Sequence, residues 1–171
     1  GRPDNVKQIH GSTPLEIGWT IVPALILAVI AVPTVSTIFD LAKQPKGSEV
    51  LNVRVSGKQW WWQFTLPPQP LVGERANDRV VTSTELHIPV DTKVFVRLTS
   101  DNAIHSFWVP ELAGTKDVVP GRTNTLTLEA SDPGTYLGAC KEYCGLSHAD
   151  MRFRVVAESR AKWKVWLAGQ Q

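Results

Sequence analysis

The sequence predicts an all-β domain, a sandwich or a barrel, preceded by one membrane-spanning α-helix. Two observations lead to this prediction. A stretch without charged side chains runs from Ile17 to Phe39, near the start of a chain of 171 residues. After it, short runs that alternate apolar with polar residues are separated by turn-forming segments such as LPPQP and SDPG. Regularly spaced short strands of this kind are typical of sandwiches and barrels.

The apolar stretch 17–39 has the length of roughly 20 residues that a helix needs to cross a hydrocarbon core. It is apolar or weakly polar on all sides, whereas a buried helix of a soluble protein usually keeps a polar stripe. It is also too long for the apolar region of a signal peptide. Basic residues flank both ends equally, so charge does not indicate the orientation. We expect residues 1–16 to form a loop before the membrane and residues 40–49 to form a linker after it.

Glu16 lies at the N-terminal end of the apolar stretch, in the run HGSTPLEIGWT. Ser12 or Thr13 is suited to cap the helix, and Pro14 is suited to its first turn. A carboxylate in that turn interacts favourably with the helix dipole. The residues alone therefore favour a capping role for Glu16 over the alternative, in which the carboxylate collects protons for a buried path.

The β domain is assigned to residues 50–157, because alternation and turn signals fill this range. The expected strands are 50–56, 59–65, 84–90, 92–100, 102–110, 123–130, 134–140 and 151–157. In the fourth of these, Val94, Val96 and Leu98 are expected to face one side and Phe95 the other. In the second, Trp60 and Trp62 are expected to share one face.

The last stretch, residues 158–171, is expected to form a short amphipathic helix. Its tryptophans and one leucine recur at helical spacing, which places Trp163, Trp166 and Leu167 on one face. A helix with one apolar face packs that face against a neighbouring element, here the β domain.

Charge and cysteine content exclude several classes of function. The chain carries 18 basic and 16 acidic side chains, a net charge of +2, spread along its length. This balance gives no field suited to nucleic acid. Its two cysteines, Cys140 and Cys144, are too few and too close in sequence for the disulfide framework of small secreted domains. The function must therefore be sought in local sites.

The segment CKEYCGLSHADM brings Cys140, Cys144, His148 and Met151 within a dozen residues at the end of an expected strand. Thiolates and thioethers are soft ligands, and together with imidazole they select copper over the hard divalent ions. A structural zinc site would more often use only cysteine and histidine. A second imidazole is available from His105, in a strand that can pair beside this loop. The sequence therefore predicts a copper site.

The second cysteine distinguishes this set from single-copper sites, which use one cysteine with two histidines and a weak axial ligand. Two thiolates can bridge two copper ions, each of which takes one imidazole. Met151 then binds one ion weakly, and a backbone carbonyl binds the other. The carbonyl of Glu142 is placed for this, while its carboxylate can point to another ion. By spacing alone, a local disulfide or two buried thiols are the alternatives for the cysteines.

The two remaining histidines have no ligand context. His10 is expected to be a solvent-exposed or loop histidine, and His87 a strand-surface histidine.

The pattern Cys-x-Glu-x-Cys-x3-His-x2-Met with a distant histidine resembles the binuclear copper (CuA) domain of cytochrome c oxidase subunit II. This sequence matches that pattern at every ligand position. The resemblance extends from about His10 to Trp166. LEIGWTIVPALIL is similar to the family's second transmembrane helix, GKQWWWQF to its aromatic strand and TKDVVPGR to one of its turns. The fold implied is a cupredoxin-like Greek-key sandwich or barrel.

The resemblance also implies roles residue by residue. The implied copper ligands are His105, Cys140, Glu142 through its carbonyl, Cys144, His148 and Met151. The Glu142 side chain resembles the family's ligand to a magnesium ion at the interface with subunit I. Trp60 matches the tryptophan through which electrons enter. Glu16 matches the carboxylate at the mouth of a proton-uptake path, which makes that role the favoured one.

The function implied is that of subunit II of a cytochrome c oxidase. Electrons would come from cytochrome c, whether soluble, membrane-bound or fused, and pass to haem in subunit I, where oxygen is reduced to water with proton translocation. Haem is expected only in that partner, and the other expected partners are further oxidase subunits and membrane lipid. The implied location is a bacterial plasma membrane or the mitochondrial inner membrane. The copper domain would lie on the periplasmic, extracytoplasmic or intermembrane side.

Three departures from the family pattern qualify this prediction. Family members usually have two transmembrane helices, so we expect a fragment that lacks the first. After Phe39 the chain carries 16 basic and 14 acidic residues, whereas docking of a basic cytochrome favours an acidic face. The Cys-x-x-Cys-His haem-attachment motif does not follow VWLAGQQ, where some relatives continue into a haem c domain.

Three other classes of protein compete with this prediction. Nitrous oxide reductase carries the same copper pair, but the membrane helix and the missing catalytic-copper domain argue against it. A membrane-anchored single-copper electron carrier would need only one of the two cysteines. A quinol oxidase subunit II normally lacks the copper ligands, which are present in this chain.

Overall fold

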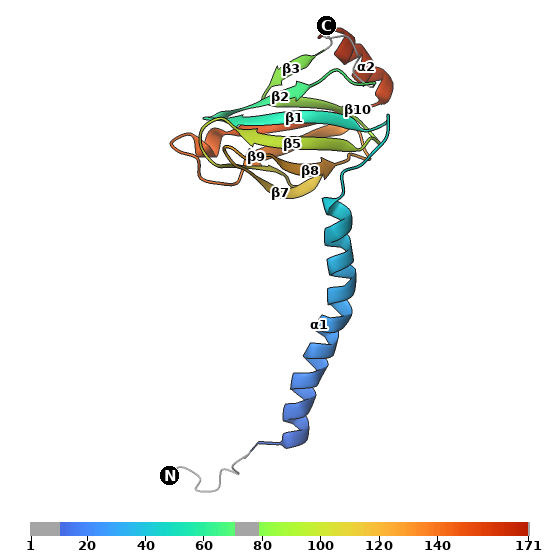
Figure 1. Ribbon diagram of the computed structural model, residues 1–171, viewed down its shortest axis with the longest axis vertical. Coiled ribbons are helices and arrows are strands. Elements are labelled where there is room, and N and C mark those ends of the chain that lie inside the picture. Colours follow the sequence, from blue (N-terminus) through green and yellow to red (C-terminus); the bar gives the residue numbers. More distant parts are fainter. Residues whose placement is uncertain (1–10, 71–78, 171) are drawn as a thin grey trace, which may run out of the picture. The chain divides into compact units, whose positions relative to one another are not determined.

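The computed structural model describes residues 11–70 and 79–170, so His10 lies outside the described residues. The chain divides into two compact units, one up to Lys43 and one from Gln44 onward. In the described residues the first unit consists of a long helix, and the second contains ten strands and a short helix (Figure 1).

The helix of the first unit, α1 (Thr13–Ala42), begins before the predicted stretch 17–39 and ends after it. Ser12 is the N-cap residue, with an extended backbone, and its carbonyl accepts a 2.9 Å hydrogen bond from the Glu16 N–H. Pro14 lies in the first turn, where its missing N–H costs no helical hydrogen bond. The Ser12 side chain makes no capping hydrogen bond within the described residues, so the expected side-chain cap is not formed.

The surface of α1 is apolar along most of its length. None of its side chains is buried in the described part of the chain, and Trp19, Leu27 and Phe39 are each more than half exposed. By length and composition the helix is suited to span a membrane. The hydroxyl groups of Thr20, Thr34 and Thr37 each donate a 2.8 Å hydrogen bond to the backbone carbonyl four residues earlier in the helix. In lipid these hydroxyls would otherwise have no hydrogen-bond partner.

The second unit is a sandwich of two five-stranded sheets in the described residues (Figure 1). The first sheet has the order β3 (Val80–Ser83), β2 (Trp61–Leu66), β1 (Leu51–Lys58), β5 (Val94–Ser100) and β8 (Asn124–Leu128). The second has the order β4 (Glu85–Pro89), β10 (Arg152–Glu158), β9 (Gly134–Cys140), β6 (His105–Val109) and β7 (Ala113–Val118). The all-β prediction is thus confirmed, although β3 and β7 were not expected.

The connections between strands repeatedly cross from one sheet to the other. The chain changes sheet at five connections: β3 to β4, β4 to β5, β5 to β6, β7 to β8 and β8 to β9. Pairing is parallel between β1 and β5 and between β4 and β10, and antiparallel in the other named pairs. Crossings of this kind give the Greek-key character expected of the fold.

The core lies between the sheets and is built from alternate residues of each strand. In β5, Val94, Val96 and Leu98 are fully buried, as predicted. Phe95 faces the opposite side but is also buried, at 4% exposure, and the Arg97 guanidinium carbon lies 4.9 Å from its ring centroid. The cationic side chain thus covers an aromatic ring on the outer face of the first sheet.

The short helix α2 (Arg160–Ala168) follows β10 and is shorter than the predicted range 158–171. Trp163 and Leu167 are buried, and the Trp163 indole N–H donates to the His87 carbonyl at 3.1 Å. Trp166 stacks on the His87 ring, with the centroids 4.2 Å apart. His87 therefore lies on β4, as expected of a strand histidine, but is half-buried beneath α2.

Candidate metal centre

The predicted ligands come together at one end of the second sheet. His105 begins β6, Cys140 ends β9, and Cys144 lies in the loop that follows. A short 3-10 helix, η1 (His148–Asp150), then leads to Met151 and into β10. Backbone pairing of Phe107 with Cys140 holds β6 beside β9. Four of these five ligand side chains are buried, those of His105, Cys140, Cys144 and Met151.

The two sulfur atoms form the middle of the cluster. Cys140 Sγ lies 3.9 Å from Cys144 Sγ, and both cysteines are free thiols. A disulfide would need about 2.05 Å between them, so the disulfide alternative does not describe this structure. His105 Nδ1 is 3.8 Å from Cys140 Sγ, and His148 Nδ1 is 3.7 Å from Cys144 Sγ. Each thiol therefore has its own imidazole neighbour.

Two weaker donors complete the arrangement. Met151 Sδ lies 3.7 Å from Cys144 Sγ, and the carbonyl oxygen of Glu142 lies 3.3 Å from Cys140 Sγ. Ligand atoms bound tetrahedrally at about 2.0–2.3 Å from one ion lie roughly 3.5 Å apart. The separations among these donors are close to that value, and His105, Cys140 and Cys144 offer ligand atoms within 4.8 Å of one another. The soft donor set fits copper.

Burial tunes the protonation of the ligands. Desolvation lowers the pKa of His105, and the neighbouring His148 lowers it further. Burial raises the pKa of Cys144 to about 11, and the adjacent Cys140 contributes in the same direction. The imidazole is thus held neutral, as a metal ligand must be, whereas the thiol keeps its proton until a metal displaces it.

Three neighbours orient His105. Its Nε2 lies 3.3 Å from Oδ1 of Asn102, which leaves Nδ1 directed at Cys140. The Trp62 ring meets it edge-on at 5.9 Å between centroids. Gly57 makes room for it, since a Cβ at that position would lie 2.8 Å from Cδ2 of His105. A second nitrogen held by a polar partner is typical of metal-binding histidines.

The three consecutive tryptophans, Trp60, Trp61 and Trp62, differ in how far they are exposed. Trp60 precedes β2 and is 36% exposed, Trp61 is 37% exposed, and Trp62 is fully buried. Trp60 and Trp62 therefore differ in exposure, although both indole N–H groups point toward the same loop. The Trp60 indole N–H donates to the Cys144 carbonyl at 3.3 Å, and the Trp62 indole N–H donates to the Met151 carbonyl at 3.4 Å. Both rings contact residues 140–151, the metal-binding loop, which holds most of the candidate ligands.

Two predicted site residues are not brought to the cluster by their side chains. Glu142 is exposed and approaches through its carbonyl alone. Glu16 is exposed in the first turn of α1, within the other unit. Sequence reasoning missed Asn102, Gly57 and Gln59, whose contacts join segments distant in sequence. The sequence signal for Asn102 was its position three residues before His105, in the run NAIH.

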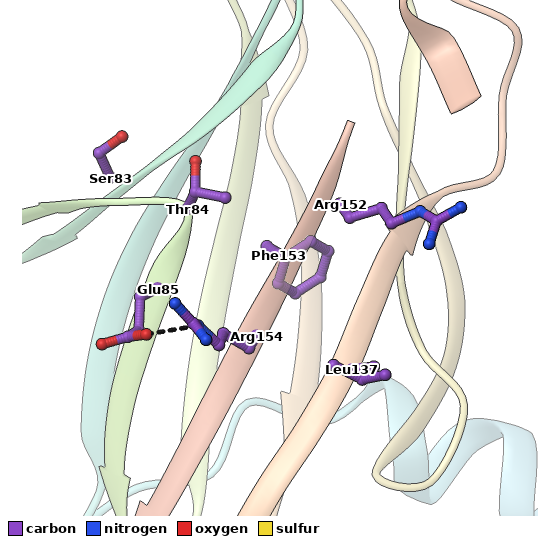
Figure 2. A pocket seen from close by; sticks show the side chains of 7 residues that line it. All are labelled: Ser83, Thr84, Glu85, Leu137, Arg152, Phe153 and Arg154. Carbon is purple, nitrogen blue, oxygen red and sulfur yellow. Dashed lines mark ion pairs between the residues drawn. The ribbon is translucent and has the colours of Figure 1, made fainter. Parts of the chain in front are cut away.

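A pocket of about 520 Å³ on the outer side of the second sheet is separate from the cluster and contains none of the predicted ligands. It is lined by Ser83, Thr84, Glu85, Leu137, Arg152, Phe153 and Arg154. Figure 2 shows the ion pair between Arg154 and Glu85 at its edge, where Nε and Oε2 are 2.6 Å apart.

Comparison with known proteins gives a consistent result. The family model of the cytochrome c oxidase subunit II periplasmic domain matches residues 51–159, and that of its transmembrane domain matches residues 3–37. Cytochrome c oxidase subunit 2 of Alkalihalophilus pseudofirmus is 41% identical over 167 residues, which are 95% of this chain and 46% of that protein. Quinol oxidase subunit 2 of Bacillus spizizenii is 34% identical over 167 residues, 96% of this chain and 49% of that protein. The chain thus spans about half the length of these relatives.

Among solved structures, the periplasmic domain of cytochrome oxidase subunit II of Bradyrhizobium japonicum aligns with a TM-score of 0.64. It is 24% identical and covers 74% of this chain and 95% of its own. The likeness confirms the cupredoxin-like sandwich. Fold and site together define a membrane-anchored cupredoxin-like domain with a thiol-rich candidate metal site. The family matches are more specific: the chain belongs to the cytochrome c oxidase subunit II family.

Proposed function

We propose that this chain is the electron-accepting subunit of a haem-copper oxidase, in which a binuclear copper (CuA) centre receives electrons from cytochrome c. The observation that carries the proposal is the pair of thiols 3.9 Å apart, each with its own imidazole nitrogen within 3.8 Å. A single-copper site needs only one of these thiols. Two metals sharing both sulfurs use the complete set.

The chain's own residues would hold the copper pair in two similar halves. His105 and the Glu142 carbonyl lie on the Cys140 side, and His148 and Met151 lie on the Cys144 side. When bound, the copper pair supplies a centre that gains and loses one electron at a time. Burial of both thiols and of His105 excludes water, and this favours the small rearrangement that rapid electron transfer requires.

Trp60 is the proposed route by which electrons enter. Its ring is partly exposed, and its indole N–H reaches the carbonyl of Cys144, a proposed copper ligand. The same side chain thus has one edge available to a donor protein and another on the backbone of a ligand. Its environment supports this role over core packing, which is the role of the fully buried Trp62.

The remaining assignments are proposals from the family. The exposed Glu142 carboxylate would bind a magnesium ion shared with subunit I, and Glu16 would lie at the mouth of a proton-uptake path. The partners would be subunit I with its haem, further oxidase subunits, cytochrome c and lipid. The copper domain would lie on the periplasmic or intermembrane side, anchored by α1. In the assembled oxidase, oxygen would be reduced to water with proton translocation.

A quinol oxidase subunit II is the second candidate function, because a relative of that name is 34% identical over 96% of this chain. The donor set discriminates between the two. Acceptance of electrons from a quinol requires no copper in this subunit. This chain, in contrast, keeps two thiols, two imidazoles and a thioether, and neighbouring donor atoms in this set lie no more than 3.9 Å apart. The cytochrome c assignment therefore has the stronger support.

Copper analysis of the purified chain in detergent tests the proposal. We expect two copper ions per chain and an electron paramagnetic resonance signal from one electron shared by both nuclei. Cys140→Ser should abolish the shared signal. Ser147→Ala, a change in the same loop at a hydroxyl that makes no capping hydrogen bond in the described residues, should retain it. One copper per wild-type chain, with a signal from a single nucleus, would contradict the paired centre.

A further inference from the structure

The carbonyl of Cys144 accepts two hydrogen bonds from the segment between β1 and β2. Gln59 Nε2 donates at 2.8 Å and the Trp60 indole Nε1 donates at 3.3 Å. The donors are neighbours in sequence but lie far along the chain from the cysteine. The shorter of the two bonds is the one made by Gln59, so the amide is the closer restraint on this carbonyl.

The residue that follows this carbonyl is Gly145, whose own carbonyl accepts a 3.1 Å hydrogen bond from the His148 N–H. Gly145 has φ +124°, a conformation that L residues rarely adopt. A Cβ on Gly145 would lie 3.1 Å from the Trp60 ring and 3.3 Å from Gln59 Nε2. The backbone here therefore lies directly against both side chains. Glycine permits the close approach, but it also leaves the peptide free to rotate unless hydrogen bonds hold it.

We propose that Gln59 is a positioning residue for electron transfer, a role that rests on the proposed function. Its amide locks the Cys144–Gly145 peptide, so that the Trp60 indole keeps its bond to the carbonyl. From that carbonyl only the Cα and Cβ of Cys144 intervene before Sγ. Without Gln59, the longer Trp60 bond is the remaining one of the two, and the loop samples orientations in which the indole and the carbonyl are apart.

A contact between Gln59 and the donor protein is the competing role, because Gln59 is exposed. The two roles differ in what they change. A residue that contacts the donor alters the donor concentration needed for half-saturation. A residue that positions the Cys144 peptide alters the rate at saturating donor and also the mobility of the loop when no donor is present.

Gln59→Met tests the role, because methionine matches the length of glutamine and has no N–H donor. Gln63→Met is the matched control: Gln63 lies on β2, and its amide contacts the Thr65 hydroxyl at 3.4 Å rather than the metal-binding loop. Two measurements are made on the full chain in detergent. One is amide hydrogen exchange of residues 143–147 in the metal-free protein. The other is the rate of copper reduction by reduced cytochrome c over a range of concentrations.

We expect about fivefold faster exchange in the loop and about fivefold slower reduction at saturating donor, the change that loss of one hydrogen bond produces. The half-saturating concentration should be unchanged, and Gln63→Met should match the wild type. A raised half-saturating concentration with an unchanged maximal rate would overturn the proposal in favour of donor contact. Unchanged exchange would overturn it as well.

The exchange measurement separates this inference from the proposed function. It needs no copper, so it decides whether Gln59 restrains the loop even if the wild-type chain fails to bind two ions. If the wild-type chain binds only one copper ion but Gln59→Met still speeds exchange in the loop, the paired centre fails and the positioning role stands. If the wild-type chain binds two copper ions but Gln59→Met changes neither exchange nor reduction, the positioning role fails and the paired centre stands.

Discussion

Gly57 and His105 are in such close contact that no larger residue fits between β1 and the histidine ring. A Cβ at position 57 would approach His105 Cδ2 to 2.8 Å and Cγ to 3.2 Å. Gly57→Ala should therefore displace the ring and destabilise the fold by about 1–3 kcal/mol, as overpacking of a well-packed core does. The measurements are copper stoichiometry and urea unfolding of the purified chain.

Gly114→Ala is the control for this change. Gly114 lies in β7, and apart from its chain neighbours no heavy atom of residues 11–70 and 79–170 lies within 4 Å of a Cβ built there. The control variant should bind copper as the wild type does. Wild-type copper binding by Gly57→Ala would show that the ring can shift without loss of the site.

Asn102 should affect metal affinity without touching the metal. Its Oδ1 lies 3.3 Å from His105 Nε2, on the side of the ring away from Cys140. Removal of a partner of this kind from a metal-binding histidine typically lowers affinity by about 10–100-fold. Asn102→Ala should show this loss in competition with a copper chelator. Asn124→Ala, which removes a side-chain hydrogen bond to Asp117 at the sandwich surface, should show no change.

Stability should fall in acid partly through Glu85. Its hydrogen bond to His87, with further contributions from the charges of His87 and Arg154, holds the pKa of Glu85 below its ordinary value of 4.5. The other ring nitrogen of His87, Nδ1, lies 3.0 Å from Oε2 of Glu158. A depressed pKa stabilises the folded state fully above the unfolded value of 4.5. That contribution is lost as the pH falls through the lower folded value.

Glu85→Gln isolates this contribution. The wild type should be the more stable protein near neutral pH, and the difference in unfolding free energy should shrink as the pH falls below about 4.5. Urea unfolding at a series of pH values measures it. A difference that stays constant down to about pH 3 would assign the effect to packing rather than to charge.

Trp60→Ala should separate electron uptake from metal binding. The indole donates to the Cys144 carbonyl but supplies none of the proposed ligands, so the copper spectrum should remain that of the wild type. Reduction by cytochrome c should be slowed by at least about tenfold, which corresponds to a barrier higher by about 1.4 kcal/mol. Stopped-flow reduction measures the rate. Unchanged oxidation of cytochrome c would remove Trp60 from the path.

Glu16→Gln distinguishes the two roles of that carboxylate. If Glu16 collects protons, oxidase turnover in the assembled complex should fall while copper content and spectrum stay unchanged. Glutamine keeps the shape of the side chain and removes its charge, so a capping role predicts only a small loss of helix stability, about 0.3–1 kcal/mol. Wild-type turnover would restore the capping interpretation.

Much of the fold was predictable because the core is periodic. In β5 the buried Val94, Val96 and Leu98 follow the alternation visible in the sequence. The strands that were missed lack that signal. In β7 (Ala113–Val118) most side chains are exposed, so alternation does not mark it. β3 (Val80–Ser83) is a short strand that lies just before Thr84, whose φ of 63° separates it from β4.

The clustering of the candidate metal ligands was predictable for a different reason. Most of its donors lie in one short segment, so their spacing is visible without knowledge of the fold. His105 was found only because its chemistry completes the set. Gln59 and Asn102 carry no such chemical mark, since amides are common on any surface. Gln59 reaches the loop, and Asn102 reaches His105, only through the way in which β1, β2 and β6 pack. Sequence patterns do not encode that packing.

The separate origin of His105 gives the site an order of assembly. The loop between β9 and β10 can gather its cysteines, His148 and Met151 while the chain is only locally organised. His105 joins them when β6 pairs with β9 through the Phe107 and Cys140 register. A chain that has not closed its second sheet therefore offers an incomplete set of donors. Uptake of the proposed copper pair would therefore depend on the finished sandwich, because only that state presents both imidazoles.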